Sequence, residues 1–192
     1  MSIRTVARIA LGGALLAELG MALHRFEVRR RIFDAAARRG SAIGRPLVVV
    51  GDPDAGVHTR LTRAYGCGDM CVDKHGCPMC TVTKVADLTK GPIDGIADDS
   101  AVVFVSCVLE YVTDPEAALR ELRRIAGSPD NLFLVFVEPW TITAALYPGA
   151  QWAGGADANA QGKVVMQPVT TARKVAIAGG LGLLALAASR RG

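Results

Sequence analysis

A cluster of cysteines lies in the stretch YGCGDMCVDKHGCPMCT, residues 65–81. It holds four of the five cysteines of the chain, in the spacing C-x3-C-x5-C-x2-C: Cys67, Cys71, Cys77 and Cys80, with His75 between them. Four soft ligands at this spacing can close a tetrahedral zinc site, and the intervening glycines permit the sharp turns that such a site needs. The pattern therefore predicts that these four cysteines are metal ligands.

Two other interpretations of the cluster stay open. The same spacing allows two disulfides in an oxidising compartment. Alternatively, Cys71 and Val72 belong to a strand that ends at Asp73, and the thiols are buried as small apolar side chains.

A turn rich in acidic residues follows the apolar run Leu47 to Val50. Its sequence is Gly51-Asp52-Pro53-Asp54-Ala55-Gly56, and we expect a helix from Thr59 to Ala64 after it. A first strand that ends in a glycine-bearing turn before a helix is where a doubly wound sheet holds a nucleotide. Asp73 falls about twenty residues after this turn, where an acid accepts hydrogen bonds from a ribose, although aspartate is also a common turn former.

The stretch from residue 101 to 126 predicts a strand followed by a helix. Ala101 to Val105 is a continuous apolar, β-branched run, which is typical of a strand covered on both faces of a parallel sheet. Thr113 or Asp114 can cap a helix, and Pro115 suits its first turn. Apolar residues then recur at helical spacing: Ala118, Leu119, Leu122, Ile125 and Ala126.

Three parts of the chain resemble a known family: the segment SCVLEYVTDPEAALRELRRI, VADLT around Asp87 and the acidic pair before Ser100. This family is the class I S-adenosylmethionine-dependent methyltransferases. The resemblance covers roughly residues 46 to 140. It implies an α/β fold with a doubly wound, mostly parallel sheet, a truncated form of the Rossmann-like methyltransferase fold. It also implies S-adenosylmethionine as cofactor, with Asp73 binding the ribose and Asp87 beside the adenine. The other residues assigned to the cofactor pocket are Gly51, Asp52, Gly56 and Ser106, with Cys107 beside Ser106.

The other elements expected in the central part of the chain are short. We expect a further buried strand at Asn131 to Val137, a linker at Gly154 to Gly162 and a last strand at Lys163 to Val169. The methyltransferase core has a pair of terminal strands, and the chain leaves room for hardly more than one. Gly40 to Pro46 predicts a link before the folded domain.

Both ends of the chain are apolar and basic. Residues 9–23 are apolar except for Glu18, and residues 175–188 are apolar without interruption. Residues 1–45 contain nine basic and three acidic side chains, and residues 173–192 contain four basic side chains and no acidic ones. The middle of the chain, residues 46–172, contains nine basic and fifteen acidic side chains. A basic footprint confined to apolar ends suits anionic lipids better than nucleic acid, so we expect membrane lipids and not nucleic acid as partners. A signal peptide, or helices lying on the domain, are the alternatives.

These patterns divide the chain into three parts. Residues 1–44 are expected to form a membrane-anchor helix and a basic juxtamembrane helix, 45–170 the methyltransferase-like domain, and 171–192 a second apolar anchor helix. The arginines after the first apolar run predict that the domain lies on the cytoplasmic, or equivalent interior, side.

Three functions follow from this organisation. The acidic residues in the glycine turn and the shortened sheet favour a methyltransferase-like domain that has lost catalysis. Such a domain would serve as a structural or scaffolding component of a membrane-linked assembly with protein partners, for instance in a virus particle. The alternatives are an active, membrane-tethered methyltransferase, which needs no fixed nucleophile or general base, and a zinc-binding or thiol redox module.

Overall fold

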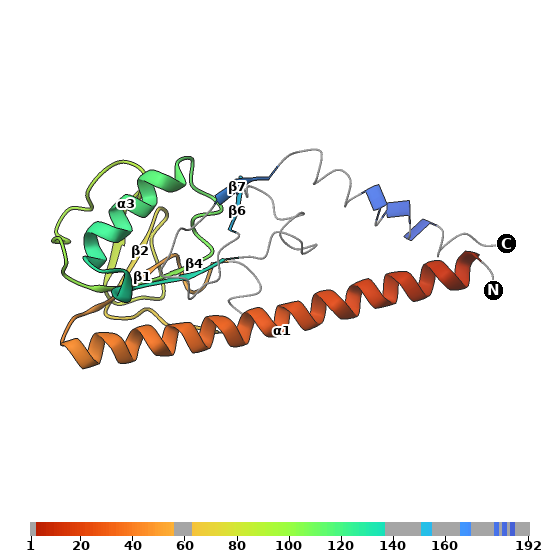
Figure 1. Cartoon of the computed structure of the whole chain (residues 1–192), viewed down its shortest axis with the longest axis horizontal. Helices are drawn as coiled ribbons and strands as arrows, with labels where there is room; N and C mark the ends of the chain where they lie inside the picture. Colours follow the sequence, from red (N-terminus) through yellow and green to blue (C-terminus); the bar gives the residue numbers. More distant parts are fainter. Residues whose placement is uncertain are drawn as a thin grey trace.

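The computed structural model of the chain describes residues 3–55, 63–136, 151–154, 166–169, 179–180, 182–183 and 185–186. Its centre is a five-stranded sheet in which every strand pairs in parallel with its neighbours. The strands are β1 (Leu47–Val50), β2 (Met70–Asp73), β3 (Thr83–Val85), β4 (Val102–Ser106) and β5 (Leu132–Val135). Their order is β3-β2-β1-β4-β5, so the winding reverses between β1 and β4. The expected α/β fold with a parallel sheet is confirmed (Figure 1).

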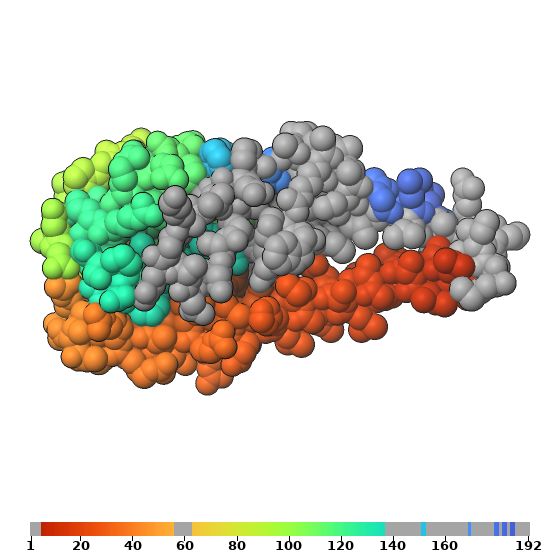
Figure 2. Space-filling model, viewed as in Figure 1, coloured from red at the N-terminus to blue at the C-terminus, as the bar shows by residue number. Residues whose placement is uncertain are grey.

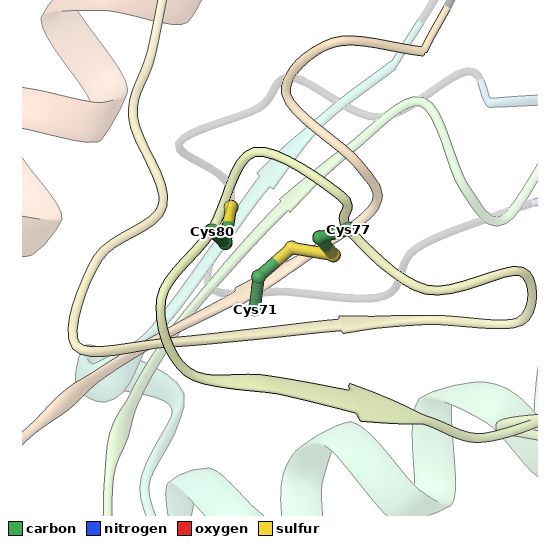
Figure 3. Close-up of side chains that lie close together, drawn as sticks. All are labelled: Cys71, Cys77 and Cys80. Atoms are coloured by element: carbon green, nitrogen blue, oxygen red, sulfur yellow. A yellow bond between two sulfur atoms is a disulfide. The ribbon is translucent and has the colours of Figure 1, made fainter.

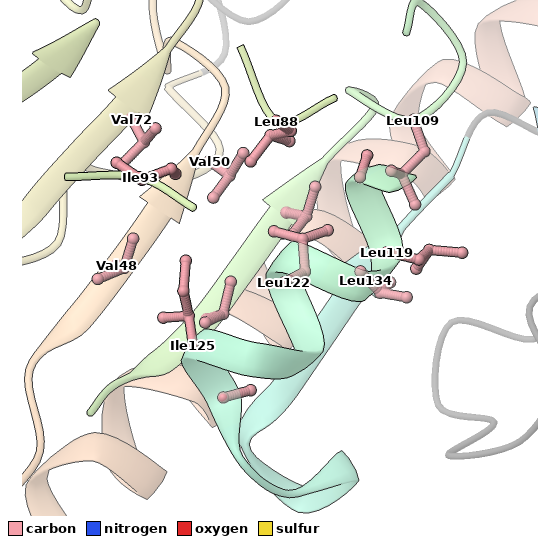
Figure 4. Packing of buried hydrophobic residues seen from close by; sticks show 14 of the residues in the cluster. Val48, Val50, Val72, Leu88, Ile93, Leu109, Leu119, Leu122, Ile125 and Leu134 are labelled. Atoms are coloured by element: carbon pink, nitrogen blue, oxygen red, sulfur yellow. The ribbon is translucent and has the colours of Figure 1, made fainter. Parts of the chain in front are cut away.

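The two central strands are buried along their whole length because helices cover both faces of the sheet. On one face α1 (Ile3–Ile43) packs Ile32 and Ala36 against β1 and β4. On the other face α3 (Pro115–Ala126) packs against the opposite side chains of the same strands, and Figure 4 shows Leu122 and Ile125 at this contact. The predicted strands at 47–50, 101–105 and 131–137 are therefore present. The first has the predicted bounds, the second is shifted by one residue, and the third begins one residue later than predicted, while its predicted end at residue 137 lies outside the described residues.

The helix predicted after residue 113 is also present. Asp114 is its N-cap, and the side chain of Asp114 accepts a hydrogen bond from the backbone N–H of Ala117 at 2.9 Å. Pro115 occupies the first turn, where its missing N–H costs nothing. Gly127 ends the helix in the left-handed region, with φ of 67°. A short 3-10 helix, η1 (Pro129–Asn131), leads into β5.

The anchor helix and the juxtamembrane helix expected within residues 1–44 form one continuous helix, α1. It continues through Gly40 to Ile43, so the predicted link at 40–46 is wrong in its first residues. Gly40 is buried against the start of β4, where an added Cβ would lie 2.9 Å from the carbonyl oxygen of Arg45. The glycine at this position thus permits close packing and does not break the helix. The turn that ends α1 is at Gly44, which has φ of 65°.

The direction in which α1 runs relative to the sheet determines the position of its apolar N-terminal half. Gly40 lies beside Val102 at the start of β4, whereas Arg29 contacts Cys107 just past the end of β4. The helix is therefore antiparallel to the strands, and its N-terminal half projects beyond the carboxyl edge of the sheet (Figures 1 and 2). Several large apolar side chains on this half are more than half exposed: Ile9, Leu15, Leu16, Leu19 and Leu23. By length and composition α1 can cross a membrane, alone among the helices in the described part of the chain.

The connection from β2 to β3 is short. Residues 74–82, all of which are described, join β2 to β3 without a helix, although a parallel crossover usually needs about a dozen residues or more. Two further strands, β6 (Trp152–Gly154) and β7 (Met166–Pro168), form a separate antiparallel pair. The strand expected at 163–169 is β7, and β6 was not predicted.

Two other expected elements lie largely outside the described residues. Of the helix expected from Thr59 to Ala64, only residues 63 and 64 are described, and they are not helical. Of the apolar run at 175–188, the described residues 179–180, 182–183 and 185–186 are helical.

Candidate ligand pocket and cysteine cluster

A pocket of about 570 Å³ opens at the carboxyl edge of the sheet. Small-molecule sites typically have volumes of about 300–1,000 Å³, and in open α/β sheets they lie where the strand order reverses. This pocket spans that position, since the segments that follow β1, β2, β3 and β4 all line it. The lining includes five of the six residues predicted to bind a cofactor: Gly51, Asp52, Asp73, Asp87 and Ser106. The sixth, Gly56, lies outside the described residues.

The turn after β1 requires glycine at its first position. Gly51 is buried with φ of 99°, and an added Cβ would lie 2.7 Å from a methyl group of Val108. The carboxylate of Asp52 accepts a hydrogen bond from the backbone N–H of Asp54 at 3.0 Å. Asp52 therefore stabilises its own turn in addition to lining the pocket.

Asp73 connects two of the loops that form the pocket. One oxygen of its carboxylate accepts from the backbone N–H of Asp52 at 3.2 Å, and the other accepts from the backbone N–H of His75 at 2.7 Å. Each carboxylate oxygen has two lone pairs, so both oxygens can still accept a bond from a ligand. The half-buried Asp73 can hold the pocket wall and contact a bound molecule at once.

Asp87, after β3, is held in a similar way. Its carboxylate accepts from the hydroxyl of Thr89 at 2.7 Å and from the backbone N–H of Thr89 at 3.0 Å. Lys74 lies 3.4 Å from its second oxygen. The bonds from Thr89, followed by the charge of Lys74, hold the pKa of Asp87 below its usual value, so the group is ionised at neutral pH. The pocket thus has an acidic wall along β1, β2 and β3.

A second, basic wall of the pocket comes from α1 and the end of β4. Arg25 and Arg29 line the pocket, and Arg29 donates from Nη2 to the sulfur of Cys107 at 3.0 Å. Burial raises the pKa of the Cys107 thiol, although the charge of Arg29 opposes the shift. Burial likewise raises the pKa of Tyr65 to about 12, so both groups are neutral near pH 7.

The sequence interpretation missed the basic wall. Arg25 and Arg29 are four residues apart and so share one face of a helix, which was the available signal. In sequence, both belong to the arginines that follow the first apolar run and indicate the flank of a membrane segment. Tyr65 was missed as well. It packs with Phe33 and Phe104 at ring distances of 6.3 and 5.1 Å, and such aromatic contacts between distant parts of the chain leave no mark in local sequence.

The four clustered cysteines form two disulfides, Cys67–Cys80 and Cys71–Cys77. Figure 3 shows the second bond, with Cys80 beside it. A sulfur in a disulfide is not a thiolate and does not ligate zinc in the usual way, so the structure supports disulfides over the predicted zinc site. The sulfurs of Cys71, Cys77 and Cys80 still lie within 4.8 Å of one another, close enough to hold a metal once reduced.

The disulfides fasten the part of the pocket that lacks a covering helix. Cys71 lies in β2 and Cys77 in the crossover to β3, so their bond encloses Asp73, Lys74 and His75, which all line the pocket. The side chains of Cys71, Cys77 and Cys80 are buried against one another in this part of the fold. Disulfides are typical of oxidising compartments and therefore oppose the predicted cytoplasmic orientation, which rests on the distribution of arginines.

No protein-family model, curated protein or solved structure matches this chain.

Proposed function

We propose that this chain is a membrane-associated protein whose α/β domain binds a nucleoside ligand of the S-adenosylmethionine type. One observation carries the proposal: Gly51, Asp73 and Asp87, at the ends of three adjacent strands, face one pocket at the reversal of strand order. The strand order β3-β2-β1-β4-β5 is also the order that doubly wound nucleotide-binding sheets use for their first five strands.

The chemistry of the pocket fits such a ligand. Ribose hydroxyls donate hydrogen bonds, and the side-chain oxygens of Asp73 offer acceptors at the end of β2. Ala86 and Leu88, beside Asp87, offer an apolar surface for a flat base. A sulfonium cation is favoured by the carboxylates of the acidic wall. When bound, S-adenosylmethionine would supply a transferable methyl group, and the residues of this chain would bind and orient it.

A second candidate is a structural role without catalysis in a membrane-linked assembly, such as the membrane layer of a virus particle. The observation that favours it is the turn after β1, where Asp52 and Asp54 stand in a loop that usually carries glycines in methyltransferases. Carboxylates at this position repel the carboxylate of the ligand. Moreover, both Asp52 and Asp73 hold the backbone of the pocket loops, which is a sufficient structural reason for their presence.

Calorimetric titration of the full chain separates these two functions. The protein would be kept in lipid nanodiscs and titrated with S-adenosylhomocysteine, the stable demethylated form of the cofactor. We expect one site with a dissociation constant in the micromolar range. Homocysteine is the matched control and should not bind, since it lacks both the ribose that Asp73 would contact and the base that Ala86 and Leu88 would contact. A folded protein that gives no heat with S-adenosylhomocysteine would contradict ligand binding and leave the structural role.

A further inference from the structure

The pocket lies on the side of the domain from which the apolar half of α1 projects. The helix is antiparallel to the strands, so the carboxyl edge of the sheet and residues 9–23 point the same way (Figure 1). Arg25 and Arg29, which line the pocket, follow closely after Leu23, the last residue of the apolar run. At 1.5 Å of rise per residue, Arg29 lies about 9 Å along the helix from Leu23. With residues 9–23 in a bilayer, the pocket lies at the lipid surface.

Arg29 is the group in this pocket that is suited to an anion. Its side chain is only 8% exposed, and its Nε has no hydrogen-bond partner among the residues that the structure describes. Burying a guanidinium in this way is costly unless each N–H is used. The charged or titratable groups that act on Arg29 are Cys107, Tyr65 and Glu110. Arg25 differs, since it lies 3.2 Å from the carboxylate of Glu18.

We propose that the pocket receives the anionic head group of a membrane lipid, which enters from the bilayer surface and binds Arg29 through Nε. This inference rests on the membrane association in the proposed function but not on the nucleoside ligand. The apolar residues Val108 and Val112 line the same pocket and suit the glycerol and upper acyl region of a lipid. A lipid is favoured over a soluble anion because the bilayer concentrates anionic head groups at the distance from Leu23 at which Arg29 lies.

Cys107 provides a native reporter inside the pocket. It is the one cysteine of the chain outside the disulfides, and Arg29 contacts its sulfur. The full chain would be placed in nanodiscs of phosphatidylcholine alone or with added phosphatidylglycerol, and the rate of Cys107 alkylation would be measured in each. At a lipid concentration of about four times its dissociation constant, an occupied pocket slows the reaction about fivefold. We expect this slowing with phosphatidylglycerol only.

Two substitutions on α1 test the role of Arg29. Arg29→Gln should abolish the difference between the two nanodiscs, and Arg29→Lys should keep part of it because the charge remains. The matched control is Arg30→Gln, which removes the same charge from an exposed neighbour and should leave the fivefold difference intact. Each variant is compared with itself in the two lipids, so a change in the intrinsic reactivity of the Cys107 thiol cancels.

Three results would overturn the proposal. They are equal rates in the two lipids, equal loss of protection in Arg30→Gln and Arg29→Gln, or equal protection by soluble glycerol 3-phosphate in phosphatidylcholine nanodiscs. The last result would indicate a site for a free anion. Titration with S-adenosylhomocysteine in the phosphatidylcholine nanodiscs, where no anionic lipid competes for the same pocket, tests the proposed nucleoside site separately.

Discussion

The backbone N–H of Asp52 donates to the carboxylate of Asp73 at 3.2 Å, which ties the turn after β1 to the end of β2. The carboxylate assigned to the ribose of a ligand is therefore also a support of the pocket wall. If Asp73 contacts a ligand, its carboxylate would do so while it holds these two loops together.

Replacement of Asp73 tests its contact with a ligand. Asp73→Ala should weaken binding of S-adenosylhomocysteine at least tenfold, since a hydrogen bond to a charged group contributes about 1.5–3 kcal/mol. Calorimetry on the full chain measures this change. Asp94→Ala, at an exposed position outside this pocket, is the control and should bind as the original chain does. Unchanged affinity in a folded Asp73→Ala protein would remove Asp73 from the ligand site.

Thiol counting decides between disulfides and a metal. Without reductant, the denatured chain should show one reactive thiol, Cys107, and after reduction it should show all five cysteines. The purified protein should contain no stoichiometric zinc. Five thiols without reductant, together with one zinc per chain, would instead establish the metal site.

The disulfides should also contribute to stability. They join residues 13 and 6 positions apart in the chain. By the loop-closure relation, removing Cys67–Cys80 should lower the free energy of unfolding by about 3 kcal/mol, and removing Cys71–Cys77 by about 2 kcal/mol. Denaturant unfolding of the two double serine variants measures these losses. If removing Cys71–Cys77 costs more than removing Cys67–Cys80, restriction of the unfolded chain is not the main source of the stability that the disulfides contribute.

Glu121 should make stability depend on pH. Its carboxylate accepts from Arg124 at 2.7 and 2.8 Å and from the backbone N–H of Ile93 at 2.9 Å. The bonds from Arg124 hold the pKa of Glu121 below its usual value. The resulting stabilisation is complete above the unfolded pKa of about 4.3 and is lost as pH falls through the folded pKa.

The variant Glu121→Gln isolates this effect. The difference in unfolding free energy between the original chain and Glu121→Gln should be constant near pH 7 and shrink below about pH 4.3. Glu116→Gln, at an exposed position in the first turn of α3, is the control and should show a much smaller difference. A difference for Glu121→Gln that stays the same down to pH 2 would show that the carboxylate charge is not responsible.

If both ends of the chain anchor it to the membrane, loss of either anchor alone should not release the protein. The full chain should stay with membranes after an alkaline wash. Leu15→Arg with Leu19→Arg places two charges in the apolar run, each costing about 2.5–3.5 kcal/mol at the centre of a bilayer helix. This pair alone, or removal of residues 173–192 alone, should leave the protein in the pellet, and the combination should release it. Glu27→Arg, past the apolar run, is the control. Recovery of the original chain in the supernatant would contradict anchoring.

The central strands and α3 were predictable because their signals are local. An uninterrupted β-branched run is typical of a strand buried on both faces, and Asp114 with Pro115 marks a helix start whatever the rest of the chain does. Among the acids of the pocket, Asp73 was predicted from its distance of about twenty residues after the glycine turn, and Asp87 from the resemblance to methyltransferases. These features need no knowledge of distant contacts.

The remaining features depend on distant contacts. In sequence, Gly40 indicates the end of a helix. In the structure, it lies within α1 and permits close packing of this helix beside β4. The spacing of the cysteines is compatible with zinc and with several disulfide pairings, and only the path of the 74–82 crossover selects one pairing. Arg29 joins the pocket because α1 runs antiparallel to the sheet, a relationship that no local pattern contains.

The uninterrupted helix from Ile3 to Ile43 gives the proposed arrangement a mechanical property. The helix has no hinge between the half proposed to lie in the lipid and the half packed on β4. Any tilt of the helix would therefore tilt the whole domain with it. Bilayer thickness, which sets the tilt of a spanning helix, would then set the height of the pocket above the head groups.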